Sequence, residues 1–407
     1  MIAAVNRLRG VARSDLAGAV GDVVVILGSS RSGSSLLKKV LAGHPDLASL
    51  DGEIDPLLAL TGNGFGFSAD SDAIGALRNA EALADNIFDE LSLPSASCAS
   101  LELLKRRWEK RCLLQFPALF TEEEGHAGLL RALEQGLAGG PDGGDERQWQ
   151  ARVLAGVFRA APWRIDYYDG SAPAAGGPSF GASLKIEEPP FVLPQHYRRP
   201  YAAADAGRKM LLFKAPADAY RIGMYEQLFP RARIHYLHLS RGYAQSVNGL
   251  MDGWLSPQGF FAHDLRRHGV RLAIPGYSDK VPFGAHWWKF DLPPNWRDFT
   301  SMPLERVCLN QWLSAHRAIL DSGVTALRLS FEEFMAAPAA CLARVTKHLG
   351  LAPLAAPAAL PVTMATDAPA PMRWKKREAL LLELGERREV RAMMAALGHP
   401  MRPEAWR

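Results

Sequence analysis

The chain has 407 residues, of which 48% are hydrophobic and 22% are charged, a balance typical of a globular protein with a substantial core. Its formal net charge of +4 is too small to indicate a nucleic-acid-binding protein, although it suits a site for an anionic small molecule. No stretch reaches the apolar length of a membrane span, so we expect no membrane partner.

The N-terminus and the cysteines favour a cytoplasmic location. Arg7, Arg9 and Arg13 interrupt the apolar core that a signal peptide would need. The four cysteines lack the C-x-x-C spacing of zinc sites, so we expect no metal. We interpret them as reduced thiols: Cys98, Cys112, Cys308 and Cys341.

The first regular unit is a strand, a loop and a helix. Residues 23–27, VVVIL, form a short apolar run that predicts a buried strand. Apolar residues at helical spacing predict a helix within 36–41, which Gly43 and Pro45 end.

The loop between them, GSSRSGSS at 28–35, nearly matches the nucleotide-binding pattern G-x-x-x-x-G-K-[ST]. Ser34 stands in place of the lysine, and a basic residue, Arg31, lies three positions earlier. A flexible Gly/Ser turn is the alternative interpretation. The strand–loop–helix context favours a phosphate site, because ligands bind at the carboxyl ends of parallel strands and at helix N-termini.

Strands and helices continue to alternate along the chain, which predicts an α/β fold with a mostly parallel central sheet and helices on both faces. Two irregular insertions interrupt them, one at about 60–210, with helical stretches near 101–114 and 127–138, and a tryptophan-rich one at 254–300. The later strands are expected within 209–214, 233–241 and 324–334, and the later helices within 219–230, 243–254, 306–323 and 338–351.

RSGSS, residues 31–35, resembles the loop of the PAPS-dependent sulfotransferases, which reads roughly [KR]-S-G-[ST]-[ST]. The cofactor of that family is 3′-phosphoadenosine 5′-phosphosulfate (PAPS), and its product is 3′-phosphoadenosine 5′-phosphate (PAP). The resemblance implies that Arg31 holds the sulfuryl group and the bridging oxygen. It also implies a 5′-phosphate site made by Ser32, Gly33, Ser34 and Ser35.

A second segment, LSRGYAQSV, resembles the family's binding site for the 3′-phosphate, and Arg241 matches its arginine. The family's serine lies eight positions further on, where this chain has Gly249. Ser246 and Asn248 are the candidate replacements. The alternative interpretation of Arg241 is a surface arginine at the end of a strand.

Further blocks follow in the family's order, including KAP at 214–216 and EEF at 332–334. They imply one sulfotransferase domain over 1–407, in which the two insertions form a cap on the acceptor side. The basic C-terminal segment RWKKRE resembles one that closes over the 3′-phosphate in the family, which implies cofactor contacts for Arg373, Lys375 and Lys376. A solvated helix start is the alternative for this segment.

The general base is expected just past the first helix, where the segment HPDLASLDGE resembles the Glu-type members found among bacteria. It indicates Glu53 as the catalytic base, with His44 as the rival. Asp51 and Asp55 flank Glu53, and three carboxylates in one cleft would raise at least one pKa by like-charge repulsion.

Three residues are candidates for contacts to the substrate. Lys214 either extends its ammonium group to solvent from a strand end or contacts the sulfuryl group or the acceptor. Trp287 and Trp288 are either core aromatics or the wall of an acceptor pocket.

These features together predict a sulfotransferase that moves a sulfuryl group from PAPS to a hydroxyl or amine of a small-molecule acceptor. Two alternatives remain: a P-loop kinase with a degenerate loop, and a nucleotide-binding protein of the same fold without activity.

Overall fold

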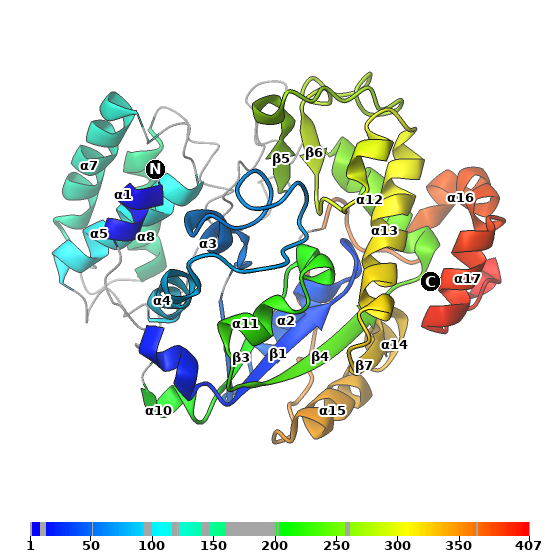
Figure 1. Ribbon diagram of the computed structural model, residues 1–407, viewed down its shortest axis with the longest axis horizontal. Helices are drawn as coiled ribbons and strands as arrows, with labels where there is room; N and C mark the ends of the chain where they lie inside the picture. The colour runs from blue at the N-terminus through cyan, green and yellow to red at the C-terminus, as the bar shows by residue number, and fades with distance from the viewer. Residues whose placement is uncertain are drawn as a thin grey trace.

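The computed structural model describes residues 2–8, 14–50, 52–92, 100–115, 120, 122–140, 146–159, 201, 203–256, 261–363 and 365–406. At its centre is a five-stranded sheet in the order β2-β3-β1-β4-β7, in which every neighbouring pair is parallel. The α/β fold with a parallel central sheet is therefore confirmed (Figure 1). The strands are β1 (Asp22–Leu27), β2 (Leu47–Ser49), β3 (Met210–Phe213), β4 (Arg233–Ser240) and β7 (Ala326–Ser330).

The sheet is covered on both faces, as expected from its apolar runs. Val24 and Ile26 of β1 belong to one hydrophobic cluster with the helices α2 (Ser34–Leu41) and α15 (Pro338–Leu349). Val23 and Val25 alternate with them and belong to the cluster on the opposite face. The other helices of the core are α11 (Met224–Leu228), α12 (Tyr243–Leu255), α13 (Leu304–Asp321) and α14 (Phe331–Ala336).

One predicted helix is shorter than expected. Within 219–230 the chain forms only the helix α11, which the short 3-10 helix η3 (Pro216–Tyr220) precedes. Arg221, Ile222 and Gly223 separate the two, and the Arg221 guanidinium forms a buried ion pair described below.

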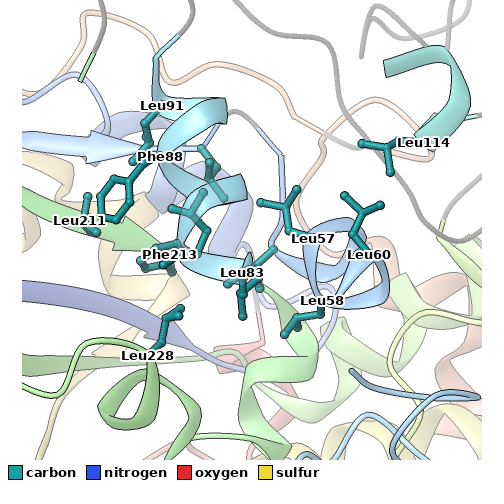
Figure 2. Packing of buried hydrophobic residues seen from close by; sticks show 14 of the residues in the cluster. Leu57, Leu58, Leu60, Leu83, Phe88, Leu91, Leu114, Leu211, Phe213 and Leu228 are labelled. Atoms are coloured by element: carbon teal, nitrogen blue, oxygen red, sulfur yellow. The ribbon is translucent and has the colours of Figure 1, made fainter. Parts of the chain in front are cut away.

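The described part of the first insertion is largely helical. The two helical stretches expected there are confirmed as α5 (Leu101–Gln115) and α7 (Glu123–Leu137), which gather with α8 (Glu146–Val157) at one side of the molecule (Figure 1). Figure 2 shows Phe88 and Leu91 of α4 (Ala80–Leu91) next to Leu211 of β3, with Phe213 of β3 close by. Leu83 of α4 lies beside the leucines of α3 (Asp55–Leu60), and Leu228 of α11 belongs to the same cluster. The N-terminal α1 (Ile2–Arg7) and η1 (Ser14–Ala19) and the short α10 (Ala203–Ala206) join this half.

The second insertion contains an antiparallel pair, β5 (Ala262–Asp264) with β6 (Trp287–Lys289), and the short helices η4 (Leu265–His268) and η5 (Trp296–Phe299). Its aromatic side chains share a hydrophobic cluster with α12, α13 and the C-terminal elements. Those elements are η6 (Arg373–Arg377), α16 (Glu378–Gly385), α17 (Arg388–Leu397) and η7 (Pro403–Ala405). Across the described residues, no helix is both long and apolar enough to cross a membrane.

Candidate functional site

The loop between β1 and α2 is shaped by two glycines. A side chain at Gly28 would bring its Cβ to 2.5 Å from the backbone oxygen of Leu239, so the loop passes directly against β4. Gly33 has a φ of 89°, and a Cβ there would meet the ring of Phe331 at 2.2 Å. The α2 helix begins one residue later, and its first N–H groups have no partner within the helix. The loop therefore presents backbone donors at the carboxyl end of β1.

Arg31 lies at the bend of this loop in the left-handed conformation, with a φ of 66°. Its side chain runs beside Gly249 of α12, where an added Cβ would lie 3.5 Å from the Cβ of Arg31. Burial lowers the pKa of Arg31 to about 10, and the nearby positive charges of Arg241 and Arg373 add to that effect. The guanidinium still carries its charge at neutral pH.

Arg241 follows β4 directly and meets the loop. Its Nη1 donates a hydrogen bond to the backbone oxygen of Arg31 at 3.4 Å, and its guanidinium lies 4.6 Å from the centre of the Phe331 ring. Burial lowers the pKa of Arg241 to about 10. The structure thus brings together two arginines that lie 210 positions apart in the chain.

Three buried polar atoms at this place have no hydrogen-bond partner in the part of the chain that the structure describes: Nε of Arg241 and the hydroxyl oxygens of Ser29 and Ser32. Unsatisfied buried donors are costly in a folded protein, and at a loop of this kind they suit an oxygen-rich anion. The residues present therefore fit a phosphorylated nucleotide.

Lys214 and Glu53 form an ion pair next to the loop. The Nζ of Lys214, at the end of β3, lies 2.5 Å from Oε1 of Glu53 and 3.1 Å from the hydroxyl of Ser35. The Lys214 side chain is 5% exposed and that of Glu53 is 22% exposed. Lys38 of α2 holds the segment before Glu53, because its Nζ donates to the backbone oxygen of Gly52 at 2.6 Å. Lys214 is therefore not a lysine that extends to solvent.

Backbone groups bind both ring nitrogens of His44, the rival base. Its Nδ1 accepts the backbone N–H of Asp46 at 3.1 Å, so its Nε2 carries the proton and donates to the backbone oxygen of Ala352 at 3.0 Å. Both ring nitrogens are thus occupied and the side chain is buried. This geometry favours Glu53 over His44 as the proton acceptor.

The expected repulsion among neighbouring carboxylates is not what the structure shows. Asp55 forms a two-pronged ion pair with Arg221, at 3.0 and 3.1 Å, and Arg221 also binds Asp218 at 2.9 Å. Glu53 is paired with Lys214 instead, so these two carboxylates each have their own cation. Asp51 lies outside the described residues.

The helix α12 carries the candidates for the position of the missing serine. Ser246 is fully buried, and its hydroxyl donates to the backbone oxygen of Arg241 at 3.4 Å. Asn248 accepts a hydrogen bond from Arg377 at 2.5 Å. Gly249 is the residue of this group that packs on Arg31.

The C-terminal basic segment is attached to α12 through one carboxylate. Asp252 forms ion pairs with Arg373 at 2.9 Å, with Lys376 at 2.5 Å and with Arg377 at 2.8 Å. Lys375 is exposed. Because the charge of Arg373 lowers the pKa of both Arg31 and Arg241, this segment lies close to the two arginines. The sequence indicated Lys376 as a candidate for cofactor contact but did not indicate its ion pair with Asp252.

The tryptophans of the second insertion lie in the interior. Trp288 has no exposed surface, and its indole N–H donates to the backbone oxygen of Asp291 at 3.0 Å. Trp287 is buried beside the guanidinium of Arg266, 5.4 Å from the ring centre. Their burial favours a core role for both, and contact with a substrate stays a prediction.

Sequence reasoning missed Asp291. Its carboxylate accepts hydrogen bonds from the hydroxyls of Ser30, in the loop, and of Tyr220, in η3. A lone aspartate in an irregular, tryptophan-rich segment gives no periodic signal, so its place beside the loop follows only from the fold.

Comparison with known proteins leaves the family open. No protein-family model matches the chain, and no curated protein matches it. Two solved structures are similar: a sulfotransferase domain from the curacin biosynthetic pathway and one from the Synechococcus PCC 7002 olefin synthase. The first has 13% identity and a TM-score of 0.36, over 94% of this chain and 99% of that one. The second has 17% identity and a TM-score of 0.29, over 82% and 74%. These low scores carry no argument, and the proposal below depends on the residues of the site.

Proposed function

We propose that this chain is a PAPS-dependent sulfotransferase that sulfates a hydroxyl or an amine of a small-molecule acceptor. The observation that carries the proposal is the meeting of Arg31 and Arg241 at a glycine-shaped loop, beside a lysine–glutamate pair. The loop supplies donors for a 5′-phosphate, and Arg241 supplies a charged group with an unsatisfied buried Nε for a second phosphate.

PAPS, when bound, supplies an activated sulfuryl group on its 5′-phosphate. In the proposal, Gly33, Ser34 and Ser35 bind the phosphate through backbone N–H groups at the start of α2. Ser32 binds it through its hydroxyl, because its own N–H donates to the backbone oxygen of Ser29 at 3.2 Å. Arg31 provides positive charge where negative charge develops, because its side chain belongs to the same loop. Arg241 and Arg373 bind the 3′-phosphate, which does not react.

Glu53 is the proposed general base. Its Oε1 is held by Lys214, and Lys214 also reaches Ser35 of the loop, so the carboxylate is kept beside the phosphate site. As a carboxylate, Glu53 accepts the proton of an acceptor hydroxyl. Lys214 also adds positive charge next to the loop, where an anionic group would bind.

The missing loop lysine is the main argument against the kinase alternative. A P-loop kinase uses that lysine on the β- and γ-phosphates and a carboxylate on magnesium. In this chain Ser34 replaces the lysine, and β4 ends at Ser240 and is followed directly by Arg241. The absence of the usual serine at Gly249 is the feature that favours an inactive binding protein.

Two arginine variants test the proposal. Arg31→Ala should reduce turnover by about 10² to 10³, as the loss of one charge-stabilising donor typically does. Arg241→Ala should weaken PAP binding with a smaller effect on turnover, because it contributes uniform binding. Steady-state kinetics and PAP titration measure both. The reverse pattern would mean that the two ends of the nucleotide are exchanged, and no effect of either variant would refute the proposed site.

A further inference from the structure

Asp291 lies where both insertions meet the phosphate loop. Its Oδ1 accepts a hydrogen bond from the hydroxyl of Ser30, one position before Arg31, and its Oδ2 accepts one from the hydroxyl of Tyr220 at 2.8 Å. The next residue, Leu292, exchanges two hydrogen bonds with Asp72 of the first insertion: its N–H donates to Oδ2 at 2.7 Å, and its oxygen accepts the Asp72 N–H at 3.0 Å. These contacts fix the carboxyl group against the loop.

The backbone on the other side of Asp291 is equally constrained. Phe290 has a φ of 64°, a conformation that a phenylalanine adopts at a cost. Its ring occupies the space above Gly253 of α12, where a Cβ would lie 2.3 Å from it. The backbone oxygen of Asp291 accepts hydrogen bonds from Trp288 and Gln311. The position of the carboxyl group is therefore specified from several elements at once.

The ionisable groups around this carboxyl group do not neutralise its charge. Asp291 is 3% exposed, and no described residue forms an ion pair with it. The neighbouring elements contribute four ionisable side chains: Tyr220, Asp72, Cys308 of α13 and Lys289. The imidazole of His263 lies 3.5 Å from Asp72, and the Nζ of Lys289 lies 5.0 Å from the centre of the Phe283 ring. Burial raises the pKa of Asp291 to about 6 and Asp72 adds to the rise, while the hydrogen bonds from Ser30 and Tyr220 lower it.

We propose that Asp291 is a positioning residue of the phosphate loop, and that its carboxylate takes up one proton when an anionic nucleotide binds there. This inference rests on the proposed function. An anion on the loop adds negative charge near a buried carboxylate, and like charge favours the neutral form. The proton comes from solvent and binds to Oδ1.

Proton uptake reverses one hydrogen bond. In the free protein the Ser30 hydroxyl donates to Asp291. Once Oδ1 carries a proton, it donates to the Ser30 oxygen instead, and the hydroxyl hydrogen of Ser30 is released to donate to the ligand. Asp291 thereby links the second insertion to the loop and adds a donor when an anion is present.

Linkage makes the effect measurable, because a ligand that raises a pKa binds more tightly at lower pH. Titration calorimetry with PAP, in buffers of different ionisation enthalpy, counts the protons taken up on binding. The phosphates of PAP exchange protons themselves near a pH of about 6, so the difference between wild type and Asp291→Asn isolates the carboxyl group. We expect wild type to take up more protons than the variant between about pH 6 and pH 7.5, and the difference to vanish near pH 5, where the free carboxyl group is already protonated.

Two further variants complete the experiment. Asp72→Asn removes a negative charge that raises the pKa of Asp291 and does not touch the loop. Proton uptake on PAP binding should therefore persist, but over a lower pH range. Ser30→Ala removes the hydrogen bond that joins the carboxyl group to the loop, so the uptake should fall, and this variant replaces Asp291→Asn if that one does not fold. We also expect Asp291→Asn to bind PAP more tightly at high pH, on the order of tenfold.

The outcomes separate this inference from the proposed function. PAP binding with equal proton counts in wild type and Asp291→Asn would overturn the role of Asp291 alone. If PAP fails to bind wild type at any pH, both the proposed function and the role of Asp291 are wrong.

Discussion

Replacing Gly33 by alanine tests the construction of the loop. Two separate effects oppose a side chain at this position. The φ of 89° is unfavourable for any residue with a Cβ, and the added Cβ would meet the Phe331 ring at 2.2 Å. Because Arg241 stacks on the same ring, a shift of Phe331 also displaces the guanidinium.

The two effects have separable magnitudes. The left-handed conformation costs about 1 to 2 kcal/mol for an alanine, and overpacking adds about 1 to 3 kcal/mol. Gly62 is a matched control, because its φ is 78° and a Cβ there would meet nothing within 4 Å. Gly62→Ala should therefore be destabilised only by the cost of the left-handed backbone. Gly33→Ala also carries the overpacking cost, so it should be the more destabilising variant by about 1 to 3 kcal/mol.

Urea denaturation of the two variants measures this difference, and titration with PAP measures the effect on binding. Gly33→Ala should weaken PAP binding, whereas Gly62→Ala should leave it unchanged. Phe331→Ala makes room for the Cβ, so its combination with Gly33→Ala should be less destabilising than the sum of the two single changes. Equal stabilities for Gly33→Ala and Gly62→Ala, with unchanged PAP binding, would refute the reasoning.

Further predictions concern the base, a buried ion pair and pH. Glu53→Gln should reduce turnover by about 10² to 10⁴ with PAP affinity nearly unchanged, whereas His44→Gln should lower mainly the free energy of unfolding. Steady-state kinetics measure the first effect and urea denaturation the second. A loss of turnover in His44→Gln with normal turnover in Glu53→Gln would make His44 the base. Asp55→Asn should destabilise the fold by about 1 to 3 kcal/mol, because it leaves the buried Arg221 with Asp218 as its remaining carboxylate, while the folded variant should keep its turnover. Burial lowers the pKa of His238 from 6.5 to about 4, so the unfolded chain binds a proton there more readily than the folded one. The free energy of unfolding should therefore fall as pH drops from about 6.5 to about 4 and should gain nothing from this histidine above that range. His238→Gln should flatten this dependence in urea titrations, and an unchanged slope would contradict the assignment.

Much of the fold could be predicted because its signals are local. The run VVVIL, the Gly/Ser loop and the helical spacing after it gave β1 and α2 with nearly correct boundaries. The strands β4 and β7 and the helices α12, α13 and α15 also follow from short apolar patterns. The helix α4 was missed although Leu83, Ile87 and Leu91 recur at helical spacing. The pair β5–β6 and the helix α8 have weaker local patterns, and contacts with other segments hold them in place.

The site was predictable only in part for the same reason. Arg31, Arg241 and Glu53 stand next to elements that the sequence indicates, so parallel strand ends bring them together. The partners of the charged groups could not be predicted: Lys214 for Glu53, Arg221 for Asp55 and Asp252 for Arg373 come from distant parts of the chain. Asp291 is the extreme case, because its contact with Ser30 spans 261 positions.

The most direct test of the proposed function follows the sulfur atom. The chain is incubated with PAPS labelled in its sulfuryl group and with a panel of phenols, alcohols and amines, without ATP or magnesium. Mass spectrometry and the label then report where the sulfuryl group goes. The account predicts a sulfated acceptor and an equal amount of PAP, both strongly reduced in Glu53→Gln. PAPS that binds but keeps its label with every acceptor would contradict the assignment as an enzyme and favour a nucleotide-binding protein without activity.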